Sequence, residues 1–152
     1  MGIKIGFFWA WMVLVLPTSD LQAQVLRLEV APPTLSFGFH LPNTKPVVRA
    51  DQPMNVTIIV LDDANEGWTV TLLAHGDLVS GRNIIPANAI FWRANPSPPF
   101  QNGRLNRDTP QTVARGFGPT TVHGTLHFSL KDQWEYSPGD YTQTLNFQLS
   151  SP

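Results

Sequence analysis

Apolar and polar residues alternate in short runs along most of this chain, and the alternation is clearest near its C-terminus. Four apolar residues share one side of the last run: Tyr141, Leu145, Phe147 and Leu149. The residues between them are polar, and a period of two is typical of a β-strand with one dry face and one solvated face. We therefore predict a terminal strand over residues 141–150, entered from a turn at Pro138 and Gly139.

Similar runs predict strands upstream. Leu26, Leu28 and Val30 alternate with charged residues, and the same pattern recurs over residues 35–41, 68–72 and 122–130.

A denser apolar run at residues 56–61 predicts a central strand covered on both faces. Residues 62–67, rich in Asp and Asn, then predict a hairpin loop.

Residues 87–119 differ from the rest, because they contain several prolines and few periodic positions. We expect long connections there, around a single strand at 89–93. The 14 prolines of the chain mark turns and strand edges and argue against long helices. The sequence thus predicts an all-β fold, an antiparallel β-sandwich of immunoglobulin-like or jelly-roll-like type.

The N-terminal 23 residues have the order of a secretory signal peptide. Lys4 provides a positive charge, residues 5–16 are almost all apolar, and a polar stretch ends at the small residue Ala23. The apolar run is about half the roughly 20 residues that span a bilayer, so no permanent membrane span is expected after cleavage. Residues 24–152 are predicted to form one domain that is secreted or displayed on the cell surface.

Composition narrows the function. The chain has no cysteine, which excludes disulfides, thiolate zinc sites and cysteine nucleophiles and fits a bacterial export route. The formal net charge of −1 argues against nucleic-acid binding driven by charge. We therefore expect no nucleic-acid partner.

Motifs for catalysis are missing from the sequence. It contains no phosphate loop, no His-Glu-x-x-His and no strand-elbow serine. His75 and Asp77 fall in a predicted turn without a nucleophile to activate, and His123 and His127 would lie about 13 Å apart on one strand, too far to share a metal ion. We expect a protein that is not an enzyme and needs no cofactor.

Oxygen ligands gather at residues 62–66, but their spacing matches no EF-hand, and the same residue types are those of a hairpin turn. No metal site is expected there.

Arginines dominate the charge of the middle segment. Residues 80–119 contain one acidic residue, Asp108, and five arginines: Arg82, Arg93, Arg104, Arg107 and Arg115. The planar guanidinium fork matches phosphate and carboxylate oxygens in pairs, so these residues are candidates for binding an anionic wall polymer. The alternative is a solvated loop surface with scattered charges.

Three aromatic residues, Trp134, Tyr136 and Tyr141, flank the Pro-Gly turn. Aromatic faces pack against sugar rings while their polar tips stay hydrated, so this group is a candidate carbohydrate platform. The alternative is that Tyr141 is a buried corner residue and Trp134 caps the core.

The order of several motifs resembles that of the WxL-type cell-surface domains of bacteria. The motifs are Gly67-Trp68-Thr-Val70, Ile85-Pro86 before an aromatic strand, Ala114-Arg-Gly116, and the terminal Pro-Gly-x-Tyr run. More loosely, the chain is similar to small secreted β-sandwiches of spore-coat or pilus-like type. The defining motifs differ, with Trp68-Thr-Val70 in place of Trp-x-Leu and Phe147 in place of a Trp.

The resemblance implies noncovalent attachment to the cell wall. We accordingly expect attachment to, or structural participation in, the cell envelope, with a wall polymer or other surface proteins as partners. One alternative is a fibre subunit that self-associates when its strand at residues 25–30 leaves its own sandwich and completes a neighbour's sheet. Another is a secreted carbohydrate-binding module.

Overall fold

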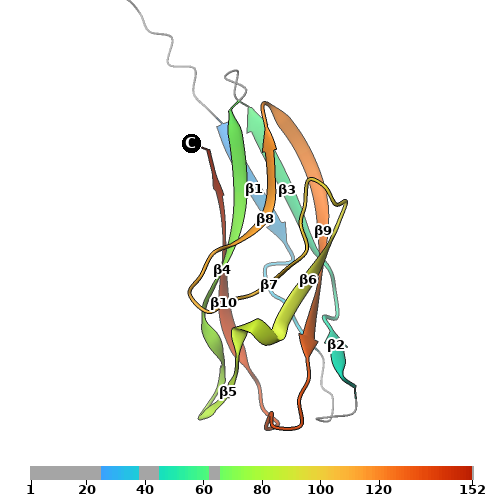
Figure 1. The fold of residues 1–152 in the computed structure, drawn as a ribbon, viewed down its shortest axis with the longest axis vertical. Coiled ribbons are helices and arrows are strands. Elements are labelled where there is room, and N and C mark those ends of the chain that lie inside the picture. The colour runs from blue at the N-terminus through green and yellow to red at the C-terminus, as the bar shows by residue number, and fades with distance from the viewer. Residues whose placement is uncertain (1–24, 38–44, 62–65, 152) are drawn as a thin grey trace, which may run out of the picture.

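The chain folds into two antiparallel sheets that pack face to face, as the sequence predicts (Figure 1). The computed structural model describes residues 25–37, 45–61 and 66–151, so the predicted signal peptide lies outside the described residues. Within these ranges no helix is long and apolar enough to cross a membrane.

The first sheet contains six strands in the order β1, β3, β9, β6 and β7, with β2 also paired to β9. Their bounds are β1 (Val25–Ala31), β2 (Val47–Arg49), β3 (Met54–Leu61), β6 (Ile90–Asn95), β7 (Gly103–Arg104) and β9 (Thr120–Lys131). The first half of β9 pairs with β3 and its last residues pair with β2, so both follow the same long strand.

The second sheet contains four strands, with β4 between β10 on one side and β5 and β8 on the other. Their bounds are β4 (Gly67–Ser80), β5 (Asn83–Ile85), β8 (Gln111–Phe117) and β10 (Thr142–Ser150). A short 3-10 helix, η1 (Ala87–Ala89), leads from this sheet into β6. Because β3 and β4 belong to different sheets, they do not form the hairpin predicted around residues 62–67, of which residues 62–65 lie outside the described residues.

Inward side chains of the central strands make the core, and their alternation follows the sequence. In β3, Val56 and Ile58 are fully buried, and in β4 Trp68, Val70 and Leu72 are buried. The predicted apolar face of β9 is likewise turned inward, and His127 is exposed on its outer face. β3 is covered on one face only, however, since Leu61 on the outer face is 54% exposed.

The strand β4 continues through residues 75–77, where the sequence predicted a turn. Gly76 has φ of 78°, a left-handed conformation that glycine adopts without steric cost. Its backbone N–H donates to Asp108 Oδ1 at 2.9 Å, and Asp77 Oδ1 accepts from the N–H of Ala87 at 2.9 Å. Gly76 and Asp77 therefore form a local distortion within a long strand, tied to the loops beside it.

The sequence pattern did not predict strand β8, because a β-bulge interrupts its alternation of inward and outward residues. Val70 pairs with Ala114 while Thr71 pairs with Thr112, which leaves Val113 as an extra residue. Val113 and Ala114 are consequently both buried although they are adjacent. The prediction of a single strand between residues 87 and 119 is wrong for this reason.

The strand predicted at residues 35–41 is not formed in its described part. Residues 35–37 have no strand conformation, and residues 38–41 lie outside the described residues.

Candidate functional site

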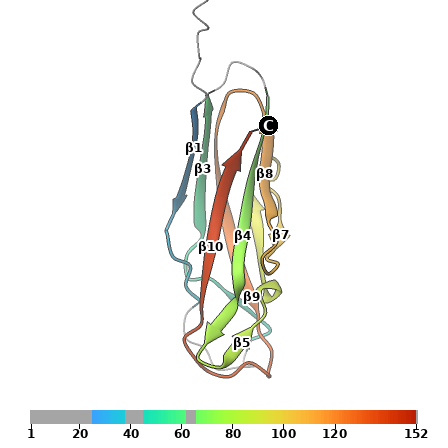
Figure 2. The same cartoon turned by 90° about the vertical axis from the view of Figure 1, so that its left-hand side faces the viewer.

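The strands β1 and β10 lie at neighbouring edges of the two sheets, on the side shown in Figure 2. Among the described residues, β1 pairs with β3 alone and β10 pairs with β4 alone. Each strand thus has one ladder edge that no described strand covers, and such edges are templates for pairing with another chain. We call the line between these two edges the seam.

The inward apolar side chains at the seam are only partly buried. They are Leu26, Leu28 and Val30 from β1 and Leu145, Phe147 and Leu149 from β10. Inward residues of the central strands are completely buried, as at Val56, Ile58 and Leu72. The difference arises because each seam strand has a neighbour on one side only, so its inner face is not closed over.

A groove of about 950 Å³ opens along the seam. Leu28 and Val30 line it from β1, and Leu145 and Phe147 line it from β10. Core residues such as Ile90 also line it. The volume lies at the upper end of the range of ligand pockets, and the lining mixes apolar side chains with polar ones such as Ser36 and Asp132. These properties suit an extended peptide segment.

The loop before β10 closes one end of this groove. Tyr141 is half-buried, and its hydroxyl donates to the carbonyl of Ser137 at 2.7 Å. Tyr136 also packs against the core, and its burial, followed by the nearby negative charges of Glu135 and Asp132, raises the pKa of its phenol above 10.0. Tyr136 therefore stays neutral at physiological pH and serves as a wall of the groove.

The predicted aromatic platform is divided by this arrangement. Tyr136 and Tyr141 line the groove, whereas Trp134 is 75% exposed and does not line it.

The predicted arginines occupy four separate places, one of which is the turn between β4 and β5, where Arg82 is exposed. Arg93 on β6 and Arg104 on β7 are exposed on the outer face of the first sheet. Arg107 pairs with Asp77 and with Asp108, each at 3.3 Å.

Arg115 lies on β8 in the second sheet, in a shallow hollow shared with Trp68 and Phe117. Trp68 Nε1 is buried there without a hydrogen-bond partner among the described residues. The atom itself is covered, so a ligand in the hollow would not reach it.

Within the part of the chain that the structure describes, no three His, Asp or Glu side chains are grouped to hold a metal ion. His123 Nδ1 instead forms a hydrogen bond with Thr57 Oγ1 at 2.9 Å across β3 and β9. Of the predicted oxygen-ligand cluster, residues 62–65 lie outside the described ranges.

No family model matches this chain, and no curated protein is similar enough to match it. The resemblance to WxL-type domains therefore stays a prediction.

Phe147 tests the half-buried character of the seam. Sequence alternation puts Phe147 on the dry face of its strand, and in the structure Phe147 faces inward and is partly exposed. Phe147→Ala should then lower the free energy of unfolding by about 2 kcal/mol, less than the roughly 3 to 5 kcal/mol typical of fully buried aromatics. A urea titration followed by circular dichroism measures the loss.

Thr144→Ala is the control for this measurement, since Thr144 is exposed on the outer face of the same strand. It should change the free energy by less than about 0.5 kcal/mol. Equal losses at the two positions would contradict the assigned register, because a one-residue slip exchanges the faces.

Proposed function

We propose that the protein is a structural subunit of a bacterial cell surface that assembles by exchanging β1 between copies. The observation that supports this proposal is the seam, where two strand edges have no described neighbouring strand and a groove with apolar and polar lining opens between them. An extended segment that adds to such an edge gains main-chain hydrogen bonds along the ladder and side-chain pockets at alternate positions.

The proposed donor is β1, because it is held less firmly than the central strands β3, β4 and β9. It pairs with one neighbour, β3, and its inward side chains are already partly exposed. Its ion pair, Arg27 with Glu29, lies within β1 itself and does not tie it to another strand. Releasing β1 consequently exposes less new apolar surface than releasing a central strand would.

Once β1 leaves, its vacated place joins the groove as one notch between β3 and β10. The β1 strand of the next copy can fill this notch with the contacts that it makes in its own domain. Exchange is therefore nearly neutral in free energy, and protein concentration together with the barrier to release governs assembly. Donor and acceptor surfaces differ, so repeated exchange produces an open chain of subunits where the rotation does not close.

An engineered disulfide across β1 and β3 tests the proposal. Arg27 and Ile59 are directly opposed in the ladder, and opposed Cα atoms in antiparallel strands lie about 4.5 to 5.5 Å apart, within disulfide range. The chain has no cysteine of its own to mispair. The oxidised Arg27→Cys/Ile59→Cys protein should remain monomeric on concentration, and the reduced protein should form oligomers, as measured by size exclusion with light scattering.

A second pair supplies the control. Leu73 and Asn146 are opposed in β4 and β10, so a disulfide between cysteines at these positions leaves β1 free. That variant should form oligomers in both redox states. Oligomers of equal size from the oxidised Arg27→Cys/Ile59→Cys protein would show that β1 does not exchange.

A further inference from the structure

A row of residues crosses the outer face of the first sheet at one level. Ser129 on β9 is directly opposite Arg49 on β2 and, on its other side, Phe91 on β6. Phe91 is in turn opposite Arg104 on β7. Opposed residues share a face of the sheet. The row therefore reads Arg49, Ser129, Phe91, Arg104 across four strands.

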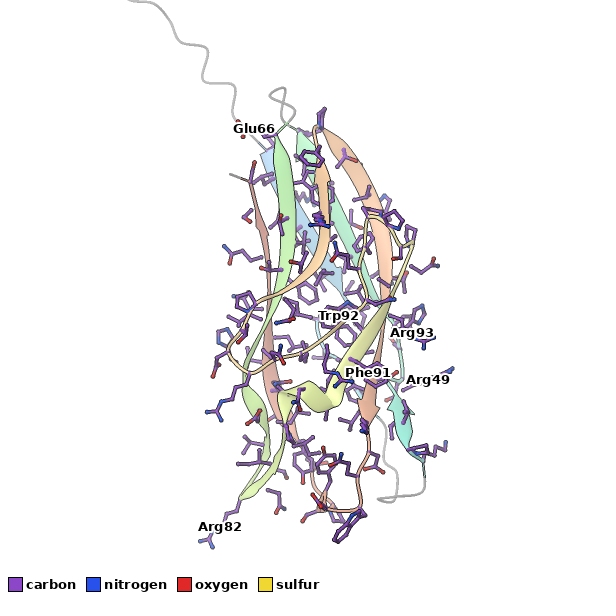
Figure 3. All side chains as sticks on the ribbon, viewed as in Figure 1. Arg49, Glu66, Arg82, Phe91, Trp92 and Arg93 are labelled. Atoms are coloured by element: carbon purple, nitrogen blue, oxygen red, sulfur yellow. The ribbon has the colours of Figure 1, made fainter. Side chains whose placement is uncertain are left out.

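A second row lies two residues away along the strands. Arg93 on β6 is opposite His127 on β9, and both are exposed. Arg93 lies about 7 Å from Phe91 along the strand, on the same face. Figure 3 shows Arg49 and Arg93 projecting from the same side of the molecule, whereas Arg82 lies at its far end. We call Arg49, Arg93, Arg104 and Phe91 the arginine face.

The charges of this face are not neutralised within the described chain. The ion pairs that join two described residues involve Arg27 and Arg107, and none of them includes an arginine of this face. All three arginines are exposed, so their guanidinium groups are available to a ligand.

The spacing of the arginines indicates the kind of anion. Arg49 and Arg104 are separated by three strand spacings, about 14 Å between backbones, a separation that suits anionic groups placed at intervals better than a single phosphate or carboxylate. A polymer with charges at intervals can contact them in succession. Phe91, half-buried between the arginines, offers part of its ring as an apolar surface. Aromatic faces pack well on rings with an apolar side.

We propose that the arginine face binds an acidic polysaccharide, with guanidinium forks on the carboxylates and Phe91 against a sugar ring. The proposal is independent of strand exchange, because the face lies on β2, β6, β7 and β9 and includes neither β1 nor β10. A subunit with such a face would attach to an anionic carbohydrate layer whatever its state of assembly.

Binding of polygalacturonate to the full chain after signal removal tests the proposal, with the fully methyl-esterified polymer as the uncharged comparison. Arg93→Gln/Arg104→Gln should raise the Kd for polygalacturonate about tenfold, as loss of two exposed ion pairs predicts. Phe91→Leu, which keeps an apolar side chain, should raise it about fivefold. Raising the salt from 50 to 500 mM should weaken binding, because exposed ion pairs are screened.

The matched control is Arg82→Gln/Arg115→Gln, which removes the same charge from two exposed positions away from this face, the β4–β5 turn and β8. It should change the Kd by less than about twofold. Thermal unfolding should be similar for the two arginine variants, since their changes are at the surface.

Several results would overturn the proposal. Equal losses in the two arginine pairs would mean that net charge alone governs binding. Polyphosphate or single-stranded DNA binding as tightly as polygalacturonate would mean that the face does not recognise a carboxylated sugar. Absence of binding to polygalacturonate at low salt would reject the proposal directly.

Discussion

Trp92→Ala should lower the free energy of unfolding by about 3 to 5 kcal/mol, a large part of the roughly 5 to 15 kcal/mol that stabilises a typical domain. Trp92 is 1% exposed, and its ring lies 5.9 Å from that of Phe128 between centroids. Its Nε1 donates to the carbonyl of Gln101 at 2.8 Å. Truncation thus leaves a cavity and an acceptor without its donor. Urea titration followed by far-UV circular dichroism measures the loss.

Trp134→Ala is the matched control, because Trp134 is 75% exposed. It should cost less than about 0.5 kcal/mol. If both tryptophan variants lost the same stability, the assignment of Trp92 to the core would be wrong.

Gly124→Ala should cost about 3 kcal/mol, because the added Cβ has no space. It would lie 2.2 Å from Cε2 of Phe100, whose side chain is completely buried and cannot move aside. Overpacking of this kind forces rings off their rotamers and shifts the backbone. The same denaturant titration gives the magnitude.

Gly67→Ala controls for the change from glycine to alanine in a strand. The nearest atom to its added Cβ would be Cε1 of Phe117 at 3.5 Å, an ordinary van der Waals contact, so the cost should be below about 0.5 kcal/mol. The double variant Gly124→Ala/Phe100→Leu should regain part of the loss through a coupling of about 1 kcal/mol or more. Additive losses in this cycle would refute a direct clash between the two residues.

The alternation of apolar and polar residues was enough to predict the β-sandwich and which side of most long strands faces the core. Residues of β9 and β10 alternate without interruption, and the structure places their apolar sides inward. The predictions for two regions were wrong, for local physical reasons. The bulge at Val113 puts adjacent residues in the core, and Gly76 with Asp77 form part of a strand although their residue types favour turns.

The seam and the arginine face depend on pairing between distant segments. The apolar residues of β1 and β10 predicted half-buried strands, but nothing in either pattern told which edges would face each other. Arg104 was a candidate from the sequence, while Arg49 was not, because it lies outside the arginine-rich middle segment. Arg49 and Arg104 lie in one row because β2 and β6 pair on opposite sides of β9.

Among the described glycines, three lie so close under an aromatic ring that a Cβ would clash with it: Gly103 under Trp92, Gly116 under Trp68 and Gly124 under Phe100. If the glycine changes first, its new side chain clashes with the ring, and if the aromatic residue changes first, a void is left. This constrains the order in which mutations can accumulate during evolution. Each pair should therefore be inherited or replaced as a unit. Divergent descendants of the same ancestor would be recognisable by these spaced glycine and ring positions after their surface motifs had been lost.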